Sequence, residues 1–287
     1  MLVPAGDLDS LGDELRRDLA RPKPRSVGFA AGHAYARVAP ADNDLGDVHR
    51  WVVGYSPRVT TVGVGLATEL LMRCLAHVAD CGGGEVTLWR ANATADDDRA
   101  ARAAGLDVDR DLHQMSVPLP LHEVASFPDG VTVRTFVPDR DDDAWLVLNN
   151  AAFAGHVEQG GWTRETLAAR RREPWFDPTW FLLAVEQDPG SGSERLIGFN
   201  WLRHHPASGN ERAIGEIYAI GVAPDQQGRG LGRALAVEGL RRVATRGTDT
   251  GMLYVAATNS AAVALYRALG FTITRTDRAY TAMVIPA

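Results

Sequence analysis

The chain has 287 residues, of which 45% are hydrophobic and 23% are charged, a composition typical of a soluble globular protein with one large or two modest domains. The formal net charge of -6 argues against a nucleic-acid-binding protein and against a polybasic protein of the membrane surface. No apolar run approaches the roughly 18 residues that cross a bilayer, and the N-terminal residues lack a signal-peptide core, so we expect a cytoplasmic protein with no membrane partner.

An internal repeat sets the domain organisation. The segment VVGYSPRVTTVGVG, from Val52, aligns without a gap on AIGVAPDQQGRGLG, from Ala219, at an offset of 167 residues. Further on, residues 100–110 are similar to residues 266–275 at an offset of 165. The shared order of strand, glycine loop, helix, strand, helix and strand predicts two copies of one domain. We expect them at 1–122 and 123–287, with the join near 118–130, where three prolines and a glycine interrupt the chain.

The first copy differs from the second in length. Only 56 residues precede Pro57, whereas 93 separate Val131 from the equivalent Pro224, so we expect the opening strand and first helix of the first copy to be missing or abbreviated. Its helix carries or adjoins both cysteines, Cys74 and Cys81. Two cysteines seven residues apart make neither a disulfide framework nor a metal cluster, so we expect idle thiols in a reducing compartment.

The second copy reads as strands that first form a meander and later alternate with helices. This order predicts an α/β fold with a mixed sheet covered by helices. Strict alternation along the strand before the glycine loop would set Glu216, Tyr218, Ile220 and Val222 on one face. A hairpin loop is expected at 188–193. The expected strands are 131–137, 180–185, 196–203, 214–222, 252–256, 271–274 and 279–285, and the expected helices are 141–154, 163–173, 231–246 and 260–269.

Clusters of potential metal ligands in the sequence have simpler interpretations. His204 and His205 precede a proline in an expected surface loop and lack partners at metal-ligand spacing. The aspartates at 96–98 and 141–143 favour helix starts. We therefore expect no metal.

The loop from Gln227 to Arg233 (QGRGLGR) links a strand to a helix. Its three glycines let the backbone approach a ligand closely. Backbone N–H groups and the dipole at a helix N-terminus attract anions, and Arg229 and Arg233 add donors suited to phosphate. The loop lacks the Lys-Ser/Thr of a Walker A motif and the third glycine of a dinucleotide-binding fingerprint. The residues therefore predict a different pyrophosphate site.

This loop resembles the acyl-CoA signature of the GNAT acetyltransferase superfamily, Q/R-x-x-G-x-G/A, and residues 259–271 (NSAAVALYRALGF) resemble its second CoA segment. The resemblance implies two tandem GNAT-like domains and acetyl-CoA as cosubstrate. In the first copy Thr60, Val62, His49 and Ala101 replace Gln227, Arg229, Glu216 and Tyr266, so we expect a degenerate, structural domain. The implied acetyl-CoA contacts are Ile220, Gly221, Val222, Gln227, Gly228, Arg229, Gly230, Leu231, Gly232, Arg233, Asn259, Ser260, Ala261, Ala262, Val263 and Ala264.

Residues 153–163 (FAGHVEQGGWT) and 215–224 (GEIYAIGVAP) are similar to the mycothiol synthase family, whose N-terminal domain is the degenerate one. The resemblance implies acetylation of the cysteinyl amine of desacetylmycothiol, a small-molecule substrate. Where the family has a lysine, this chain has Arg203, and Asp13 is the nearest match to the family's glutamate in the first helix. The implied substrate contacts are Asp13, Glu158, Arg203, Glu216 and Tyr254.

The expected chemistry assigns roles to two residues. A cysteinyl ammonium has a pKa of about 7.7–8.0, so a base must remove its proton, and we expect Glu216 to do so. A backbone N–H near Val222 could hold the oxyanion. Tyr266 would protonate the leaving thiolate as a neutral acid. No activated Cys or Ser is evident, so we expect direct attack on the thioester.

Two alternatives stay open. One is a GNAT enzyme that acetylates another small amine or a protein N-terminus. The other is an acyl-CoA-binding sensor without turnover. For these two functions, as for the acetylation of desacetylmycothiol, we expect a monomer.

Overall fold

The computed structural model describes residues 26–31, 34–41, 49–56, 59–154, 159–187, 192–207 and 212–287, so Asp13 and Glu158 lie outside the described residues. The described chain forms two compact units. Unit 1 comprises the described residues up to His113 with Ala256–Thr258 and Arg275–Ala287, and unit 2 comprises Gln114–Val255 and Asn259–Thr274. Of the helices in the described ranges, none combines the length and apolar character that crossing a membrane requires.

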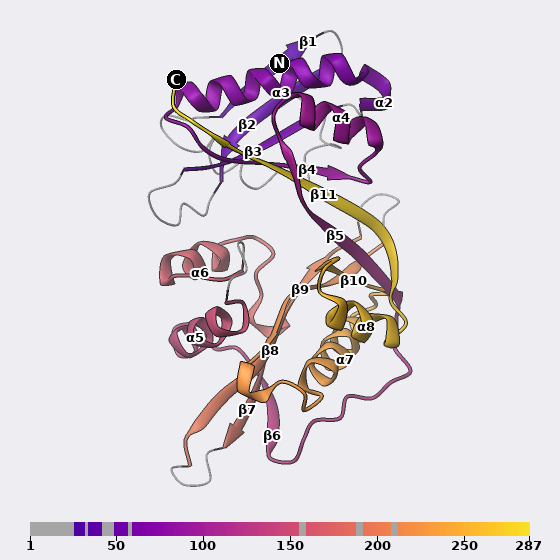
Figure 1. The fold of residues 1–287 in the computed structure, drawn as a ribbon. Helices are drawn as coiled ribbons and strands as arrows, with labels where there is room; N and C mark the ends of the chain where they lie inside the picture. The colour runs from indigo at the N-terminus through magenta and orange to yellow at the C-terminus, as the bar shows by residue number, and fades with distance from the viewer. Residues whose placement is uncertain are drawn as a thin grey trace. The chain divides into compact units, whose positions relative to one another are not determined.

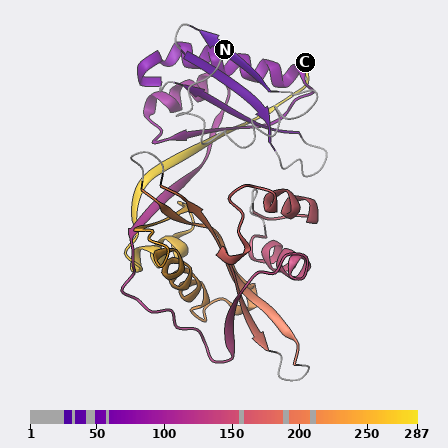
Figure 2. The same cartoon turned by 180° about the vertical axis from the view of Figure 1, so that it is seen from behind.

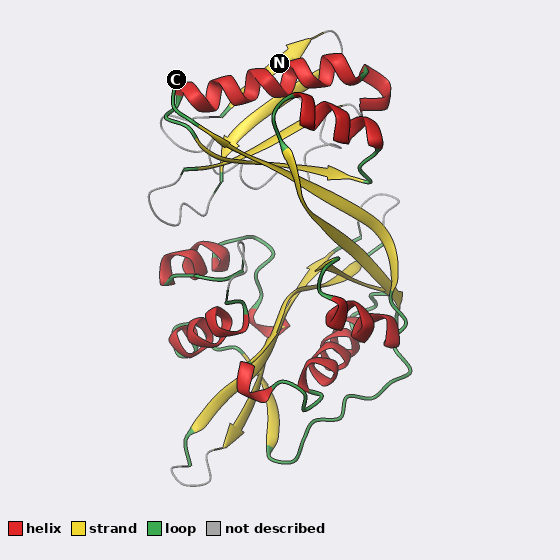
Figure 3. Ribbon diagram, viewed as in Figure 1, coloured by secondary structure: helices red, strands yellow, loops and turns green. Residues whose placement is uncertain are grey.

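Unit 1 is a sheet with its helices on one face (Figure 3). Its strand order is β1-β2-β3-β4-β11-β5, where β5 (Asp107–Pro118) contributes its residues up to His113. Strands β1, β2 and β3 form an antiparallel meander, β4 joins β3 in parallel, and β11 joins β4 in antiparallel fashion. The strands are β1 (Val27–Ala31), β2 (Ala34–Pro40), β3 (Arg50–Ser56), β4 (Gly84–Ala91) and β11 (Thr272–Val284), and the helices are α2 (Val59–Val62), α3 (Val64–Asp80) and α4 (Ala95–Ala103).

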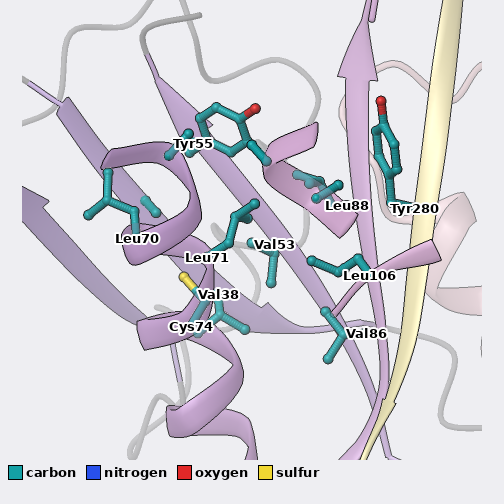
Figure 4. Close-up of a cluster of buried hydrophobic side chains, with 14 of the residues drawn as sticks. Val38, Val53, Tyr55, Leu70, Leu71, Cys74, Val86, Leu88, Leu106 and Tyr280 are labelled. Atoms are coloured by element: carbon teal, nitrogen blue, oxygen red, sulfur yellow. The ribbon is translucent and has the colours of Figure 1, made fainter. Parts of the chain in front are cut away.

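Helix α3 builds the core of unit 1. Its buried residues Ala67, Leu70, Leu71, Cys74 and Val78 recur at helical spacing, so they form one apolar stripe against the sheet. Figure 4 shows this stripe meeting side chains of β2, β3, β4 and β11 in one cluster. Burial raises the pKa of the Cys74 thiol to about 12, which keeps this thiol protonated and inert.

Unit 2 is a three-layer arrangement with the strand order β5-β10-β9-β8-β7-β6. Helices α5 and α6 cover one face of the sheet and α7 and α8 cover the other (Figures 1 and 2). The strands are β5 (Asp107–Pro118), β6 (Val131–Thr135), β7 (Phe181–Gln187), β8 (Glu194–His205), β9 (Ile214–Val222) and β10 (Thr250–Ala256). The helices are α5 (Asp142–Ala152), α6 (Arg164–Arg171), α7 (Leu231–Ala244) and α8 (Ser260–Ala268).

Strand β9 contains a bulge that the sequence did not reveal. Its register against β8 passes from Leu202↔Ile217 to Trp201↔Ala219, which leaves Tyr218 as an extra residue. Ile217 packs with the core beneath α7 and α8, whereas Tyr218 and Ala219 both pack with the aromatic core beneath α5 and α6. The prediction that Glu216, Tyr218, Ile220 and Val222 share one face is therefore wrong, because the extra residue reverses the alternation.

The parallel ladder between β9 and β10 ends early. It runs from Ile214↔Thr250 to Ile217↔Leu253, and Ile220 and Val222 lie beyond its end. The sheet of unit 2 therefore splits between these strands, beside Ile220, Gly221 and Val222, which the family resemblance implies as acetyl-CoA contacts.

The repeat is visible in part in the backbone. Gly63 and Gly230, which are equivalent at the offset of 167, both have a φ of 81° and both directly precede a helix, α3 or α7, but their ψ values are 151° and 0°. The counterpart of β6, α5 and α6 would fall within residues 1–25, outside the described residues, so the shortened N-terminus stays a prediction.

Strands β5 and β11 contribute to both units, as does β10 through its last residue, Ala256. Strand β11, where two shorter strands were expected, is one continuous strand, and it supplies Thr272–Thr274 to unit 2 and the remainder to unit 1. Strand β5 likewise divides after His113. The boundary expected between residues 122 and 123 concerns the two copies of the repeat. It stays a prediction, because each compact unit contains residues from both sides of that boundary.

Candidate functional site

The turn that follows β9 prepares an anion site at the start of α7. Gly228 and Gly230 have φ values of 78° and 81°, a left-handed conformation that favours glycine. The first hydrogen bond of the helix runs from the Ala234 N–H to the Gly230 carbonyl, so the N–H groups of residues 231–233 have no acceptor within the helix. This end of the helix dipole attracts negative charge.

A pocket of about 460 Å³ opens at this turn. It lies between the end of β9, the glycine loop and α8. Most of the predicted acetyl-CoA contacts line it, together with Tyr266 and with Gln226 and Leu265, which the sequence analysis missed. Leu265 follows Ala261 by four residues and so shares its helix face, a spacing that could have identified it. The lining residues are Ile220, Gly221, Val222, Gln226, Gln227, Gly228, Gly230, Leu231, Gly232, Arg233, Ala261, Ala262, Leu265 and Tyr266.

Five predicted acetyl-CoA contacts do not line the pocket. Asn259 caps α8, because its side chain accepts a hydrogen bond of 3.1 Å from the Ala262 N–H. Val263 is buried in the core beneath α7 and α8. The others are Arg229, Ser260 and Ala264. Their cofactor role stays a prediction.

The two arginines of the loop are paired with carboxylates. Arg229 donates to Glu186 at 3.1 Å and also to Gln226. Arg233 makes two hydrogen bonds of 2.6 Å to Glu123, which raise the pKa of Arg233 and lower that of Glu123. A diphosphate would therefore compete with carboxylates for these guanidinium groups.

Tyr266 lies on the pocket wall formed by α8. Its side chain is 7% exposed and its ring centre lies 5.6 Å from that of Phe271. Burial raises the pKa of the hydroxyl to about 12. The group is therefore a neutral hydrogen-bond donor at physiological pH.

Glu216 does not line this pocket. The bulge turns it toward the opposite face of the sheet, where its carboxylate lies 2.7 Å from Nε2 of His205. It pairs with Met252 next to Ile217↔Leu253, the last pair before β9 and β10 separate. Glu216 and the pocket therefore lie on opposite faces, and the split between the strands opens beside this carboxylate.

Two more predicted substrate contacts share the face of Glu216. Arg203 is its register partner on β8, and its guanidinium lies 4.9 Å above the Trp175 ring. Tyr254 follows Met252 by two residues on β10, so it points to the same face. It is 38% exposed and accepts a hydrogen bond of 3.1 Å from Gln114.

The expectation for the two histidines is wrong. Strand β8 continues to His205, so both belong to a strand rather than to a surface loop. His204 stacks on Trp180, with ring centres 6.0 Å apart, and His205 contacts Glu216 on the other face. Within the described ranges, no three His, Cys, Asp or Glu side chains are grouped as metal ligands would be.

Comparisons with known proteins identify the family of the chain. Residues 145–271 match the acetyltransferase (GNAT) family. A mycothiol acetyltransferase from Thermobispora bispora is 46% identical over 213 residues, which cover 72% of this chain and 69% of the relative. One from Mycolicibacterium gilvum is 39% identical over 285 residues, 95% of this chain and 88% of the relative.

A crystal structure of a GCN5-related N-acetyltransferase from Sphaerobacter thermophilus has the same fold. It superposes with a TM-score of 0.72 at 22% identity and covers 96% of this chain and 86% of its own. The fold, the glycine loop and these relatives lead to one family. The chain belongs to the mycothiol acetyltransferase family and is an N-acetyltransferase with two GNAT-like domains in tandem.

Proposed function

We propose that the protein transfers an acetyl group from acetyl-CoA to the cysteinyl amine of desacetylmycothiol, giving mycothiol and CoA. One observation carries the proposal. A glycine-lined pocket lies on one face of the sheet, at the place where β9 and β10 separate. The buried carboxylate of Glu216 lies beside the same separation on the other face. The name shared by the relatives supports the substrate.

The pocket suits acetyl-CoA. The N–H groups at the start of α7 and the side chains of Arg229 and Arg233 would bind the diphosphate, with Glu186 and Glu123 released. Ile220 and Val222 have no ladder partner on β10, so their strand edge can accept the amide groups of the pantetheine arm. The small side chains of Ala261 and Ala262 leave room along α8.

The reaction begins with a proton on the substrate amine. Glu216 would take one proton from the ammonium, and the free amine would attack the thioester carbonyl carbon. A backbone N–H near Val222 would hold the oxyanion. When the C–S bond breaks, the Tyr266 hydroxyl would donate a hydrogen bond that stabilises the leaving thiolate. The second amine proton would then protonate the CoA sulfur.

The face around Glu216 suits a charged, hydroxyl-rich substrate. Its carboxylate attracts an ammonium, while Arg203 and Tyr254 present donors and acceptors for sugar and inositol hydroxyls. The exposed part of the Trp175 ring adds an apolar surface. Asp13 and Glu158 are proposed as further substrate contacts from the resemblance alone.

The test is an acetyl-CoA assay on a panel of small amines, read by product mass because desacetylmycothiol carries its own thiol. Strong preference for this substrate, with an N-acetylated cysteinyl product, would support the proposal. Turnover of other amines only would refute the substrate and keep the acetyltransferase. Acetyl-CoA binding without turnover of any amine would favour the sensor.

A further inference from the structure

His205 makes a specific contact with the proposed base. Its Nε2 atom lies 2.7 Å from Oε2 of Glu216, and the Glu216 side chain is 10% exposed against 35% for His205. A carboxylate can only accept hydrogen bonds, so Nε2 carries the proton in this contact. Among the described side chains, His205 alone hydrogen-bonds to this carboxylate.

The groups around Glu216 leave its other oxygen open. Arg203 pairs with Glu216 across the ladder but lies over Trp175, and Tyr218 follows on the same strand. From β10, Met252 and Tyr254 face it, and Arg170 of α6 lies 5.7 Å from the Tyr218 ring. With Oε2 bound to His205, Oε1 remains to meet a substrate ammonium.

We infer that His205 is a positioning residue, which fixes the Glu216 carboxylate with one oxygen turned toward the substrate amine. The inference rests on the proposed function. A hydrogen bond to an ionised group is short and directional, so it fixes the orientation of that group. Removing the donor frees the carboxylate to rotate.

The test compares His205→Ala with His205→Gln, whose amide keeps an N–H donor. For His205→Ala we expect kcat to fall about 10-fold, the scale of one charge-assisted hydrogen bond. We also expect an unchanged KM for acetyl-CoA. His205→Gln should recover most of kcat. His204→Gln, on the other face of the same strand, is the control.

Two results would overturn the inference. One is a His205→Ala protein with the kcat of the wild type. The other is a His205→Gln protein as slow as His205→Ala, because a donor alone would then be insufficient. Wild-type protein inactive on every amine would refute the proposed function instead.

A second inference concerns the place in unit 1 that corresponds to the acetyl-CoA pocket of unit 2. The β3–β4 ladder runs from Arg50↔Glu85 to Val53↔Leu88. At the repeat offset of 167, Val53 corresponds to Ile220, which lies beyond the end of the β9–β10 ladder. The position of Ile220 is therefore paired in unit 1, whereas Tyr55, at the position of Val222, lies beyond the end of the β3–β4 ladder.

Side chains fill the equivalent space. Tyr55 corresponds to Val222 and Asp97 to Ala262, both pocket-lining residues in unit 2. The Tyr55 hydroxyl donates to Asp97 at 2.8 Å, and Arg90 donates to Asp97 and to the Tyr55 carbonyl, each at 2.9 Å. The Arg90 guanidinium lies 4.0 Å from the centre of the Tyr55 ring.

The negative charge at the start of α4 also disfavours binding of the anionic CoA in unit 1. The first turn of α4 carries Asp96, Asp97 and Asp98, whereas that of α8 is Ser-Ala-Ala. We propose that unit 1 is a closed copy and that the chain binds one acetyl-CoA, in unit 2. This rests on the acetyl-CoA site of the proposed function.

Calorimetric titration with CoA tests this proposal, and the repeat supplies a matched pair of variants. Gly230→Asp puts a carboxylate at the loop of unit 2, and Gly63→Asp makes the same change at the same φ in unit 1. We expect one CoA per wild-type chain, no binding to Gly230→Asp, and wild-type stoichiometry and Kd for Gly63→Asp. Two CoA molecules per wild-type chain, or binding that survives in Gly230→Asp, would refute the closed copy. No binding to wild-type protein would refute the proposed site itself.

Discussion

Replacing Tyr266 with Phe removes one hydroxyl from the pocket and leaves the ring in place. The ring is 7% exposed and packs beside Phe271, and Phe keeps both features. Loss of one neutral hydrogen-bonding group changes the free energy of unfolding by about 1 kcal/mol at most. A fall in activity would then report on chemistry rather than on folding.

The size of that fall follows from the pKa of Tyr266. Burial raises it to about 12, whereas a free thiol has a pKa of about 8.5. Full proton transfer from Tyr266 to a free thiolate would be unfavourable by about 5 kcal/mol, at 1.36 kcal/mol per unit. Tyr266 therefore stabilises the sulfur by hydrogen bonding. A bond to a charged group contributes about 1.5–3 kcal/mol, so kcat should fall roughly 10- to 150-fold.

Product mass under saturating acetyl-CoA measures this effect, with CoA affinity measured separately. The hydroxyl stays protonated through about pH 10, so the shape of the pH profile below that point should not change. Wild-type kcat in Tyr266→Phe would remove this residue from the mechanism. A loss confined to CoA affinity would mean that the hydroxyl serves binding alone.

Three further predictions test the loop, the α8 cap and an acidic helix start. Gly230→Ala, at a φ of 81°, should strain the loop by about 1 kcal/mol and weaken CoA binding in calorimetry. Gly247→Ala, at 82°, should carry the same strain with unchanged affinity, and an equal loss of affinity in both would contradict the reasoning. Asn259→Ala should lower the free energy of unfolding in urea by about 1 kcal/mol, and a stability equal to the wild type would exclude the cap. Burial opposes ionisation of Asp141, but hydrogen bonds led by Arg134 lower its pKa to about 2. Because the folded pKa is the lower one, about 2 kcal/mol of stability should be lost as the pH falls from about 4 to 2. Asp141→Asn should flatten that dependence in acid unfolding, and an unaltered slope would contradict it.

The local parts of the site could be predicted from the sequence. Glycines at 228, 230 and 232 ahead of an apolar stripe predicted a loop and a helix start, and α7 begins at Leu231. The spacing that ends at Gly270 predicted α8. These features depend on backbone conformation and on helical periodicity, which neighbouring residues determine.

The parts that depend on partner strands could not be predicted in this way. Nothing within GEIYAIGV marks Tyr218 as an extra residue, because a bulge is defined by the register against β8. The contact of His205 with Glu216 depends on the same register. Likewise, the sequence of β11 predicted two short strands, and it marks neither their continuity nor the unit whose sheet each part completes.

The division of β11 between the units sets an order for folding during synthesis. Tyr280 is fully buried in the core of unit 1, and its hydroxyl donates to Asp98, a residue 182 positions earlier in the chain. Domains generally fold as units while the ribosome elongates the chain from the N-terminus. Unit 1 must instead keep the edge of β4 uncovered until β11 has been made, after nearly all of unit 2.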